Sequence, residues 1–230
     1  MLYVILAEAA VELVPDEIAQ HPQVQRDAKR LGKKAQEMLL DSSRHWEAMA
    51  VLPEKEKRGR PDITHFCLLT AMESATGKSG GLRVLVHTRN GELIRIGQET
   101  RLPRVYDRFV GLVEDVYVKK TIKTKEGLEL LSIETHYPLE KVLSEIPKEV
   151  KKIVLDPEGE KLGLAALCEK FSAHGDLCVV VGGFAHGKFK NASAFSGMEK
   201  ISVSDRELAA WTALGMAVFA YEYGRKERGS

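Results

Sequence analysis

The run Leu177–Val181 is apolar at every position and ends at two glycines, Gly182 and Gly183. A strand without polar alternation is buried on both faces, which is typical of a parallel sheet covered by helices on each side. Further apolar segments and helical patterns alternate along the chain at 2–7, 152–156, 162–171 and 204–222. We therefore predict an α/β fold with a mostly parallel sheet.

One β-hairpin stands out in the middle of the chain, where Asn90 and Gly91 form the strongest two-residue turn signal between strands at 82–88 and 92–96. Weaker patterns predict a loop through 15–22, helices at 25–40, 44–49, 63–74 and 101–117, a linker at 76–81, an exposed basic strand at 119–125 and a frayed end at 224–230. We expect a single domain over 1–230, with an inserted region at about 76–127.

Charge and cysteine usage argue against a generally basic nucleic-acid-binding protein and against a disulfide or zinc framework. The 230 residues carry a formal net charge of +1, so any nucleic-acid binding must come from local clusters. The cysteines, Cys67, Cys168 and Cys178, are far apart and lack metal-ligand spacing, which predicts reduced thiols and no metal. The apolar N-terminus is too short to span a membrane. We expect a cytoplasmic protein without a membrane partner.

The segment 57–69 packs several cations and one carboxylate around Pro61 and runs directly into an apolar helix. Such a charged tip on a buried element presents a polar site rigidly. The motif R-P-D-I-T-H-x-C-L-L at 60–69 resembles the signature of the ribosome-biogenesis pseudouridine N1-methyltransferases of the SPOUT superfamily. The segment L-L-D-S-S at 39–43 is similar to the same family, and we expect Asp41 to orient the signature loop.

Two glycine- and serine-containing loops follow strands in the last third of the chain. V-G-G-F-A-H-G at 181–187 would, by itself, equally well form a plain tight turn. Ser204 or Asp205 is a competent cap for the terminal helix. Together with I-S-V-S-D-x-x-L-x-A at 201–210, these loops resemble the family's S-adenosylmethionine loops. The resemblance implies a deep C-terminal trefoil knot and cofactor contacts by Leu155, Gly182, Gly183, Gly187, Ile201, Ser202, Val203, Ser204, Asp205, Arg206 and Leu208.

The segment 100–112 places Arg101, Arg104 and Arg108 at steps of three and four, so in a helix they share one face. A solvated face paired with acidic neighbours is one explanation. Three arginines on one face repel one another, which favours the alternative that they bind an anion. Phosphate is a suitable anion, because the planar guanidinium can donate two parallel hydrogen bonds to it. T-R-L-P-R-x-x-x-R-F-x-G-L resembles the family's RNA-binding element, and Arg60 joins these arginines in the resemblance.

The family resemblance implies methyl transfer to N1 of a pseudouridine in a hairpin loop of small-subunit ribosomal RNA. That nitrogen carries a proton, so the site needs a proton acceptor or a group that stabilises the anionic ring. Asp62 is the candidate acceptor, and Arg60 is the candidate stabiliser. Asp62 alternatively pairs with Arg58 or Arg60 and only holds the loop.

The resemblance also implies a homodimer, since knotted cofactor sites of this superfamily dimerise. An alternative function is that of a ribosomal-RNA-binding assembly factor whose methylation is secondary. A third alternative is a methyltransferase that acts on small molecules or proteins, and the clustered arginines argue against it.

Overall fold

The computed structural model describes residues 1–226, and within them the strands form one eight-stranded sheet. The strands are β1 (Leu2–Ala9), β2 (Leu82–Thr88), β3 (Leu93–Ile96), β4 (Thr121–Lys123), β5 (Glu129–Glu134), β6 (Lys151–Lys161), β7 (Leu177–Gly182) and β8 (Glu199–Ser202). The α-helices are α1 (Asp16–Ala19), α2 (Pro22–Leu31), α3 (Ser42–His45), α4 (Pro61–Met72), α5 (Ala75–Lys78), α6 (Tyr106–Lys119), α7 (Leu139–Ser144), α8 (Leu164–Ser172) and α9 (Ala210–Lys226). Short 3₁₀ turns are η1 (Ala35–Glu37), η2 (Ala48–Val51), η3 (Lys55–Lys57) and η4 (Ala192–Phe195).

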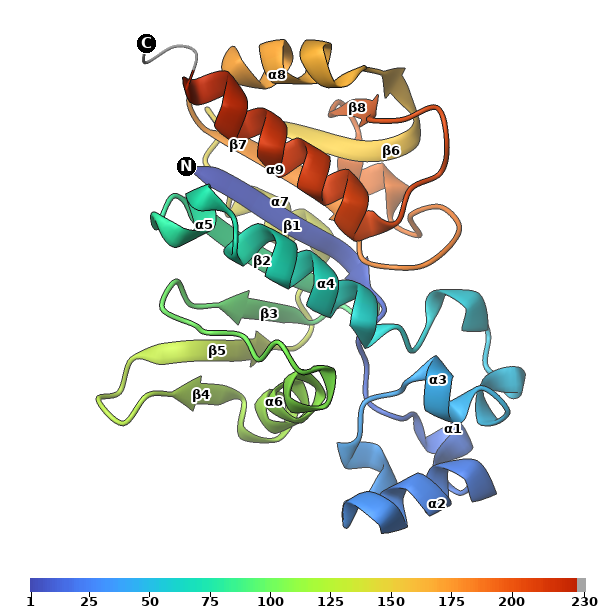
Figure 1. Cartoon of the computed structure of the whole chain (residues 1–230). Coiled ribbons are helices and arrows are strands. Elements are labelled where there is room, and N and C mark those ends of the chain that lie inside the picture. The colour runs from blue at the N-terminus through green and yellow to red at the C-terminus, as the bar shows by residue number, and fades with distance from the viewer. Residues whose placement is uncertain (227–230) are drawn as a thin grey trace.

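The strand order is β4-β5-β3-β2-β1-β7-β6-β8 (Figure 1). Strands β2, β1, β7, β6 and β8 run parallel, whereas β3, β5 and β4 add an antiparallel edge. The α/β class predicted from the sequence is confirmed, with a mixed sheet. β1 lies between β2 and β7, so segments from the start, middle and end of the chain meet at the centre of the sheet.

The central strands are buried on both faces, as their apolar sequences predict. In β7, Val179 packs into the core on one side of the sheet and Val180 into the core on the other. Helices α4, α6, α8 and α9 supply the first core, whereas α7 and η4 supply the second. In Figure 1, α4 and α9 lie side by side in front of the sheet and α7 lies behind it. Successive side chains of a strand point to opposite faces of the sheet. Because both faces are buried here, the apolar runs in these strands are continuous.

Residues 11–60 form a helical lobe between β1 and α4, which projects from the end of β1 (Figure 1). The lobe has its own small apolar core, which includes Val24, Met38 and Met49. The predicted loop through 15–22 and the predicted helix over 25–40 are therefore wrong in their bounds. α2 already begins at Pro22, because proline fits the first helical turn, and it ends before Gly32, whose φ of 64° breaks the helix.

The predicted hairpin is confirmed, because β2 and β3 pair antiparallel and Gly91 adopts a φ of 75° in the turn. The predicted basic strand corresponds to β4, which turns through Gly127, with a φ of 90°, into β5. The helix predicted at 63–74 is confirmed as α4, and its first turn starts two residues earlier at Pro61. Proline at this position pre-sets the helical φ.

Other predicted bounds differ from the structure. The predicted helix 44–49 is split into α3 and η2, and the predicted linker 76–81 overlaps α5. The terminal helix begins at Ala210 instead of Ser204, so neither Ser204 nor Asp205 caps it. β5, α7 and β8 were not predicted, because they are short and lack a clear period. α9 continues to Lys226, so 224–226 are helical, and the rest of the predicted frayed end lies outside the described residues.

Candidate functional site

A cavity of about 590 Å³ opens where β6, β7 and β8 end and α9 begins. Three segments line it: the bend of β6, the loop after β7, and the loop that leads from β8 into α9. Carboxyl ends of parallel strands are where open α/β sheets bind ligands. The lining contains all but two of the predicted cofactor residues: Leu155, Gly182, Gly187, Ile201, Ser202, Val203, Ser204, Arg206 and Leu208.

The two remaining predicted residues, Gly183 and Asp205, lie beside the cavity. Gly183 packs against β1, where an added Cβ would lie 2.7 Å from the Cα of Ala9. The Asp205 carboxylate points to solvent and pairs with Lys161 at 3.3 Å. Gly183 thus allows the close approach of two strands, and Asp205 lies on the outer side of its loop.

The bend of β6 forms one wall of the cavity. Ile201 is opposite both Leu155 and Glu160, so the intervening residues bulge out of the ladder. Gly159 permits this bulge, since an added Cβ would lie 2.5 Å from the carbonyl carbon of Lys200. This wall was missed by the sequence analysis beyond Leu155, although an Asp-Pro-Glu-Gly run directly after an apolar strand is a turn signal.

Asp156 places a negative charge in this wall. Its carboxylate accepts hydrogen bonds from the Glu158 backbone N–H and from Lys200 Nζ, both at 2.9 Å. Burial acts to raise the pKa of Asp156, but these bonds and the Lys200 charge outweigh it and lower the pKa below its ordinary value. Asp156 is therefore ionised at neutral pH, and it can accept hydrogen bonds from a ligand.

The loop after β7 is held against the N-terminal third of the chain. Lys57 Nζ donates to the carbonyl oxygen of Lys188 and lies 5.5 Å from the centre of the Phe184 ring. Gly187 adopts a φ of 90°, and an added Cβ there would lie 2.7 Å from Lys57 Cε. At Gly182 an added Cβ would lie 2.9 Å from the Phe184 ring. Both glycines therefore make room for neighbours that shape the cavity.

The loop that leads into α9 forms the third wall. Ser202 Oγ donates to the carbonyl oxygen of Ser204 at 2.8 Å, and Ser204 Oγ accepts from the Arg206 N–H at 3.0 Å. Trp211, in the first turn of α9, also lines the cavity. Its ring packs against that of Phe66, with 5.2 Å between the ring centroids. The sequence analysis missed Trp211 because it lies beyond the motif.

Arg60 and Asp62 form a bidentate ion pair. Arg60 Nε and Nη2 each lie 2.8 Å from one carboxylate oxygen of Asp62. This hydrogen bonding raises the pKa of Arg60, so its guanidinium stays charged. Arg60 lines the cavity, whereas Asp62 does not. Of the two pairings considered for Asp62, the structure shows the one with Arg60, because Arg58 pairs with Glu12 instead.

The Arg58–Glu12 pair anchors the signature loop inside the molecule. Glu12 is 1% exposed, and its carboxylate oxygens accept from Arg58 Nε at 2.9 Å and Nη2 at 2.6 Å. Arg89 approaches the same carboxylate at 3.6 Å. The Arg60 N–H then donates to the carbonyl oxygen of Ala10 at 3.0 Å, so the chain leading to Arg60 is fixed on both sides.

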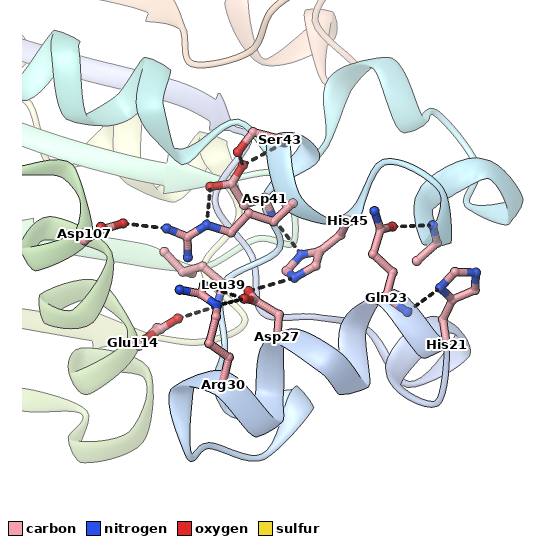
Figure 2. Close-up of polar contacts among 12 residues, drawn as sticks. His21, Gln23, Asp27, Arg30, Leu39, Asp41, Ser43, His45, Asp107 and Glu114 are labelled. Atoms are coloured by element: carbon pink, nitrogen blue, oxygen red, sulfur yellow. Dashed lines mark hydrogen bonds and ion pairs between the residues drawn. The ribbon is translucent and has the colours of Figure 1, made fainter.

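Asp41 connects the helical lobe to α6, and Figure 2 shows its contact with Ser43. Its carboxylate accepts from the Ser43 N–H at 2.9 Å, and from the Tyr106 hydroxyl at 2.8 Å. Burial, followed by the charge of Asp41, raises the pKa of Tyr106, so the hydroxyl keeps its proton and donates. The neighbouring Ser42 N–H donates to the Gly59 carbonyl oxygen at 2.8 Å. Asp41 therefore joins the lobe to Tyr106 of α6, and the backbone of its neighbour Ser42 joins the lobe to the signature loop; that Asp41 orients this loop stays a prediction.

His45 completes this polar cluster. Its Nδ1 accepts from the Asp41 N–H at 3.2 Å, so Nε2 carries the proton and faces Asp27 at 3.5 Å (Figure 2). Burial lowers the pKa of His45 although Asp27 and Asp41 oppose the shift. The ring is therefore neutral at pH 7. In the same junction Glu114 of α6 accepts from the Leu39 N–H at 2.9 Å, which ties α6 to the lobe.

Arg101, Arg104 and Arg108 are all exposed, but the predicted helical face is wrong. Only Arg108 lies in α6, because residues 101–105 form no helix and α6 begins at Tyr106. Pro103 keeps the residue before it out of the helical region. Arg104 is 80% exposed and lies 3.2 Å from Glu73.

His65 joins the arginine segment to the signature helix. Its Nε2 donates to the carbonyl oxygen of Pro103 at 2.7 Å, since a carbonyl can only accept. The ring stacks on Phe109 of α6, with 4.4 Å between ring centroids. These contacts connect α4, which follows Arg60, to the segment that carries Arg101 and Arg104.

Metal, thiol and membrane sites were also considered in the part of the chain that the structure describes. Residues 1–226 contain no group of three or more His, Cys, Asp or Glu side chains placed to hold a metal ion. Burial raises the pKa of the Cys67 and Cys178 thiols to about 12, which leaves them protonated and unreactive. None of the described helices combines the length and the apolar character that a membrane span requires.

Comparison with known proteins identifies the family. The model of the EMG1/NEP1 methyltransferase family matches residues 4–222. The chain belongs to this family. A ribosomal RNA small subunit methyltransferase Nep1 from Thermococcus kodakarensis is 44% identical over 96% of this chain and 98% of its own length. A protein of the same name from Pyrococcus furiosus is 39% identical, over 96% of both chains.

A solved structure of the family matches the chain over almost its full length. The crystal structure of Archaeoglobus fulgidus Nep1 bound to S-adenosylhomocysteine matches with a TM-score of 0.85 at 33% identity. The match covers 97% of this chain and 98% of that chain. The family membership predicted from the signature, arginine and glycine motifs is thereby confirmed.

Proposed function

We propose that this protein is an S-adenosylmethionine-dependent methyltransferase that methylates N1 of a pseudouridine in a hairpin loop of small-subunit ribosomal RNA, during ribosome biogenesis. The observation that carries the proposal is the cavity at the ends of β6, β7 and β8, in a chain that matches an S-adenosylhomocysteine-bound Nep1 over almost its full length. Family membership supports the RNA methyltransferase class.

The residues of the cavity fit an adenosine-containing sulfonium cofactor. The volume of about 590 Å³ lies within the range of small-molecule sites, and one wall is apolar while Asp156 supplies an acceptor. The loops around Gly182 and Ile201 offer backbone groups for the nucleoside. When bound, S-adenosylmethionine supplies a methyl group on a positively charged sulfur. The cavity walls exclude water and fix the direction from which a base can approach.

Arg60 is the residue that faces the reacting base in this proposal. Loss of the N1 proton leaves negative charge on the ring and its carbonyl oxygens, and a guanidinium at the cavity edge stabilises that charge. Asp62 engages Nε and Nη2 of Arg60, so Nη1 lies outside this ion pair and can donate to the substrate. We therefore assign Asp62 the orientation of Arg60, with proton acceptance as the alternative.

The Asp62→Asn variant separates these roles. If Asp62 only orients Arg60, methyl transfer slows at every pH and the pH–rate profile keeps its shape. If Asp62 accepts the proton, the acidic limb of the profile is lost. Arg60→Lys serves as the companion variant, because lysine keeps the charge but not the bidentate geometry.

The RNA is held by Arg60, Arg101, Arg104 and Arg108. Arg101, Arg104 and Arg108 are exposed, which suits phosphate contacts, whereas the half-buried Arg60 lines the cavity, where it suits a splayed base. The triple variant Arg101→Ala, Arg104→Ala, Arg108→Ala should lose hairpin binding and keep its melting temperature. Undiminished hairpin binding would instead favour a substrate other than RNA.

Further parts of the proposal concern the architecture. A deep trefoil knot is proposed for the C-terminal strands, supported by the order β7-β6-β8 and the bend of β6. A homodimer is proposed, supported by the exposed Phe66 on α4 and Phe219 on α9. The chain is proposed to be one domain with the hairpin region 76–127 as an insertion, and its cytoplasmic location remains a prediction.

Calorimetry with S-adenosylhomocysteine tests the cofactor assignment. The unaltered protein should bind it, and Gly182→Val should not, because the added side chain displaces the Phe184 ring. Hairpin RNA binding should survive in this variant. If Gly182→Val also supports ribosome assembly in cells, the protein acts chiefly as an assembly factor and methylation is secondary.

A further inference from the structure

Glu8 has three unusual properties at the end of the central strand β1. It is a charged residue only 6% exposed, and its φ of 53° lies in the left-handed region that side chains other than glycine rarely adopt. It also lies in an irregularity of the β1–β2 ladder, where Leu6 pairs with Val86 and Ala9 with Thr88. Two residues of β1 therefore face one of β2, which is a β-bulge that re-aims a side chain.

The bulge sends the Glu8 carboxylate to the loop after β7. Its two oxygens accept hydrogen bonds from the backbone N–H groups of Lys190 and Asn191, both at 2.7 Å. The backbone on either side of Glu8 is fixed to Gly183, which donates to Ala7 at 2.9 Å and accepts from Ala10 at 2.8 Å. The carboxylate is thus held rigidly while it binds the far end of the same loop.

The loop segment between these two attachments lines the cavity. Phe184 and Phe189 both contribute to the wall, and their rings meet edge to face with centroids 5.4 Å apart. Phe189 in turn packs on the buried ring of Phe195, 4.8 Å away. Lys190 follows Phe189 directly, so the position of the Lys190 N–H determines where the Phe189 ring enters the cavity.

We propose that Glu8 is a positioning residue for the cofactor site, which acts by holding the loop 183–191 in its binding conformation. The inference rests on the proposed function, and it adds a residue outside every motif of the sequence. Backbone strain at such a site persists only where the surroundings over-determine it, and here two charge-assisted hydrogen bonds do so. Glu8 touches neither the cavity nor the reacting base.

Three variants test this role. Glu8→Gly removes the carboxylate and accepts the positive φ without strain, so its fold is preserved. Glu8→Gln keeps the shape but replaces one acceptor oxygen with an NH₂ group that faces an N–H. Glu134→Gln is the control, because Glu134 carries the same charge and pairs with Arg95 at 2.8 Å between β5 and β3, in the half of the sheet away from β7 and its loop.

The readouts are S-adenosylhomocysteine affinity by calorimetry, hairpin RNA affinity, melting temperature, and hydrogen exchange of the Lys190 and Asn191 amides. In Glu8→Gly and Glu8→Gln we expect affinity for S-adenosylhomocysteine to fall about tenfold to a hundredfold, as for other small displacements of a binding group. The two amides should exchange faster, while hairpin affinity and the cooperative melting of Glu8→Gly stay unchanged. Glu134→Gln should behave as the unaltered protein.

Two results would overturn the inference. One is unaltered S-adenosylhomocysteine affinity in Glu8→Gly. The other is a loss of hairpin affinity and melting temperature that parallels the loss of cofactor affinity, which would indicate a general structural role. If the unaltered protein does not bind S-adenosylhomocysteine at all, the proposed function fails instead. Faster exchange of the two amides in Glu8→Gly would still support the clamp in that case.

Discussion

The buried pair of Glu12 and Arg58 gives the sharpest prediction about stability. Glu12→Gln removes the negative charge from a site where the carboxylate is 1% exposed and bound at 2.9 and 2.6 Å by one guanidinium. The variant leaves Arg58 buried, with Arg89 nearby, and without a counter-charge. Breaking a buried ion pair from one side costs about 3–5 kcal/mol.

Glutamine retains one acceptor oxygen, so the lower part of that range is expected. We predict a loss of about 3 kcal/mol in the free energy of unfolding, since one hydrogen bond to the charged group survives. For a chain of this length, that corresponds to a melting temperature lower by about 6–12 °C. Equilibrium unfolding in urea, followed by tryptophan fluorescence and circular dichroism, measures both quantities.

Asp115→Asn is the control for Glu12→Gln. Asp115 pairs with Lys119 at 2.8 Å on the surface of α6, where both side chains are more than half exposed. Its loss should change the free energy of unfolding by about 0.5 kcal/mol or less. If Glu12→Gln also costs less than about 1 kcal/mol, the pair does not anchor the signature loop as argued.

Three further predictions concern packing, pH and salt. Gly183→Ala should destabilise the fold by about 1–3 kcal/mol in urea unfolding, because its Cβ would lie 2.7 Å from the Ala9 Cα; an unchanged midpoint would contradict this packing. Burial lowers the pKa of His45 and His87 in the folded state. Below pH 6.5 the unfolded state therefore binds more protons than the folded state, so the free energy of unfolding should fall as the pH is lowered. Replacing His87 with leucine should weaken that pH dependence, and an unchanged slope would refute the assignment. Arg104→Ala should reduce the slope of log affinity for hairpin RNA against log salt by about 0.9, and an equal slope would exclude a phosphate contact.

The central sheet was predictable because short stretches of sequence already indicate its strands and its hairpin turn. Val179 and Val180 are both apolar since the strand faces a core on each side, and the Asn90-Gly91 turn needs only two residues to be recognised. The loops proposed to bind the cofactor were predicted from their motifs, and most of the predicted residues line one cavity. Short strands such as β8 carry too few residues for a period to appear.

Tertiary contacts explain what the sequence did not predict. Nothing local indicates that Glu8 adopts a positive φ or that Arg58, and not Arg60, binds Glu12. The helical lobe was misread because its short helices are stabilised by their own core and by Asp41, not by length or amphipathic pattern. The arginine segment was predicted to be helical because steps of three and four fit a helix, although residues 101–105 form no helix.

A methyl-transfer assay on two matched RNA hairpins tests the proposed reaction most directly. The hairpins are identical except for uridine or pseudouridine in the loop, and the protein is supplied with labelled S-adenosylmethionine. We predict transfer to the pseudouridine hairpin alone, at N1, because only pseudouridine presents a ring N1–H for methylation. Transfer to neither hairpin, although both bind tightly, would contradict the proposed reaction and leave an RNA-binding assembly factor as the function.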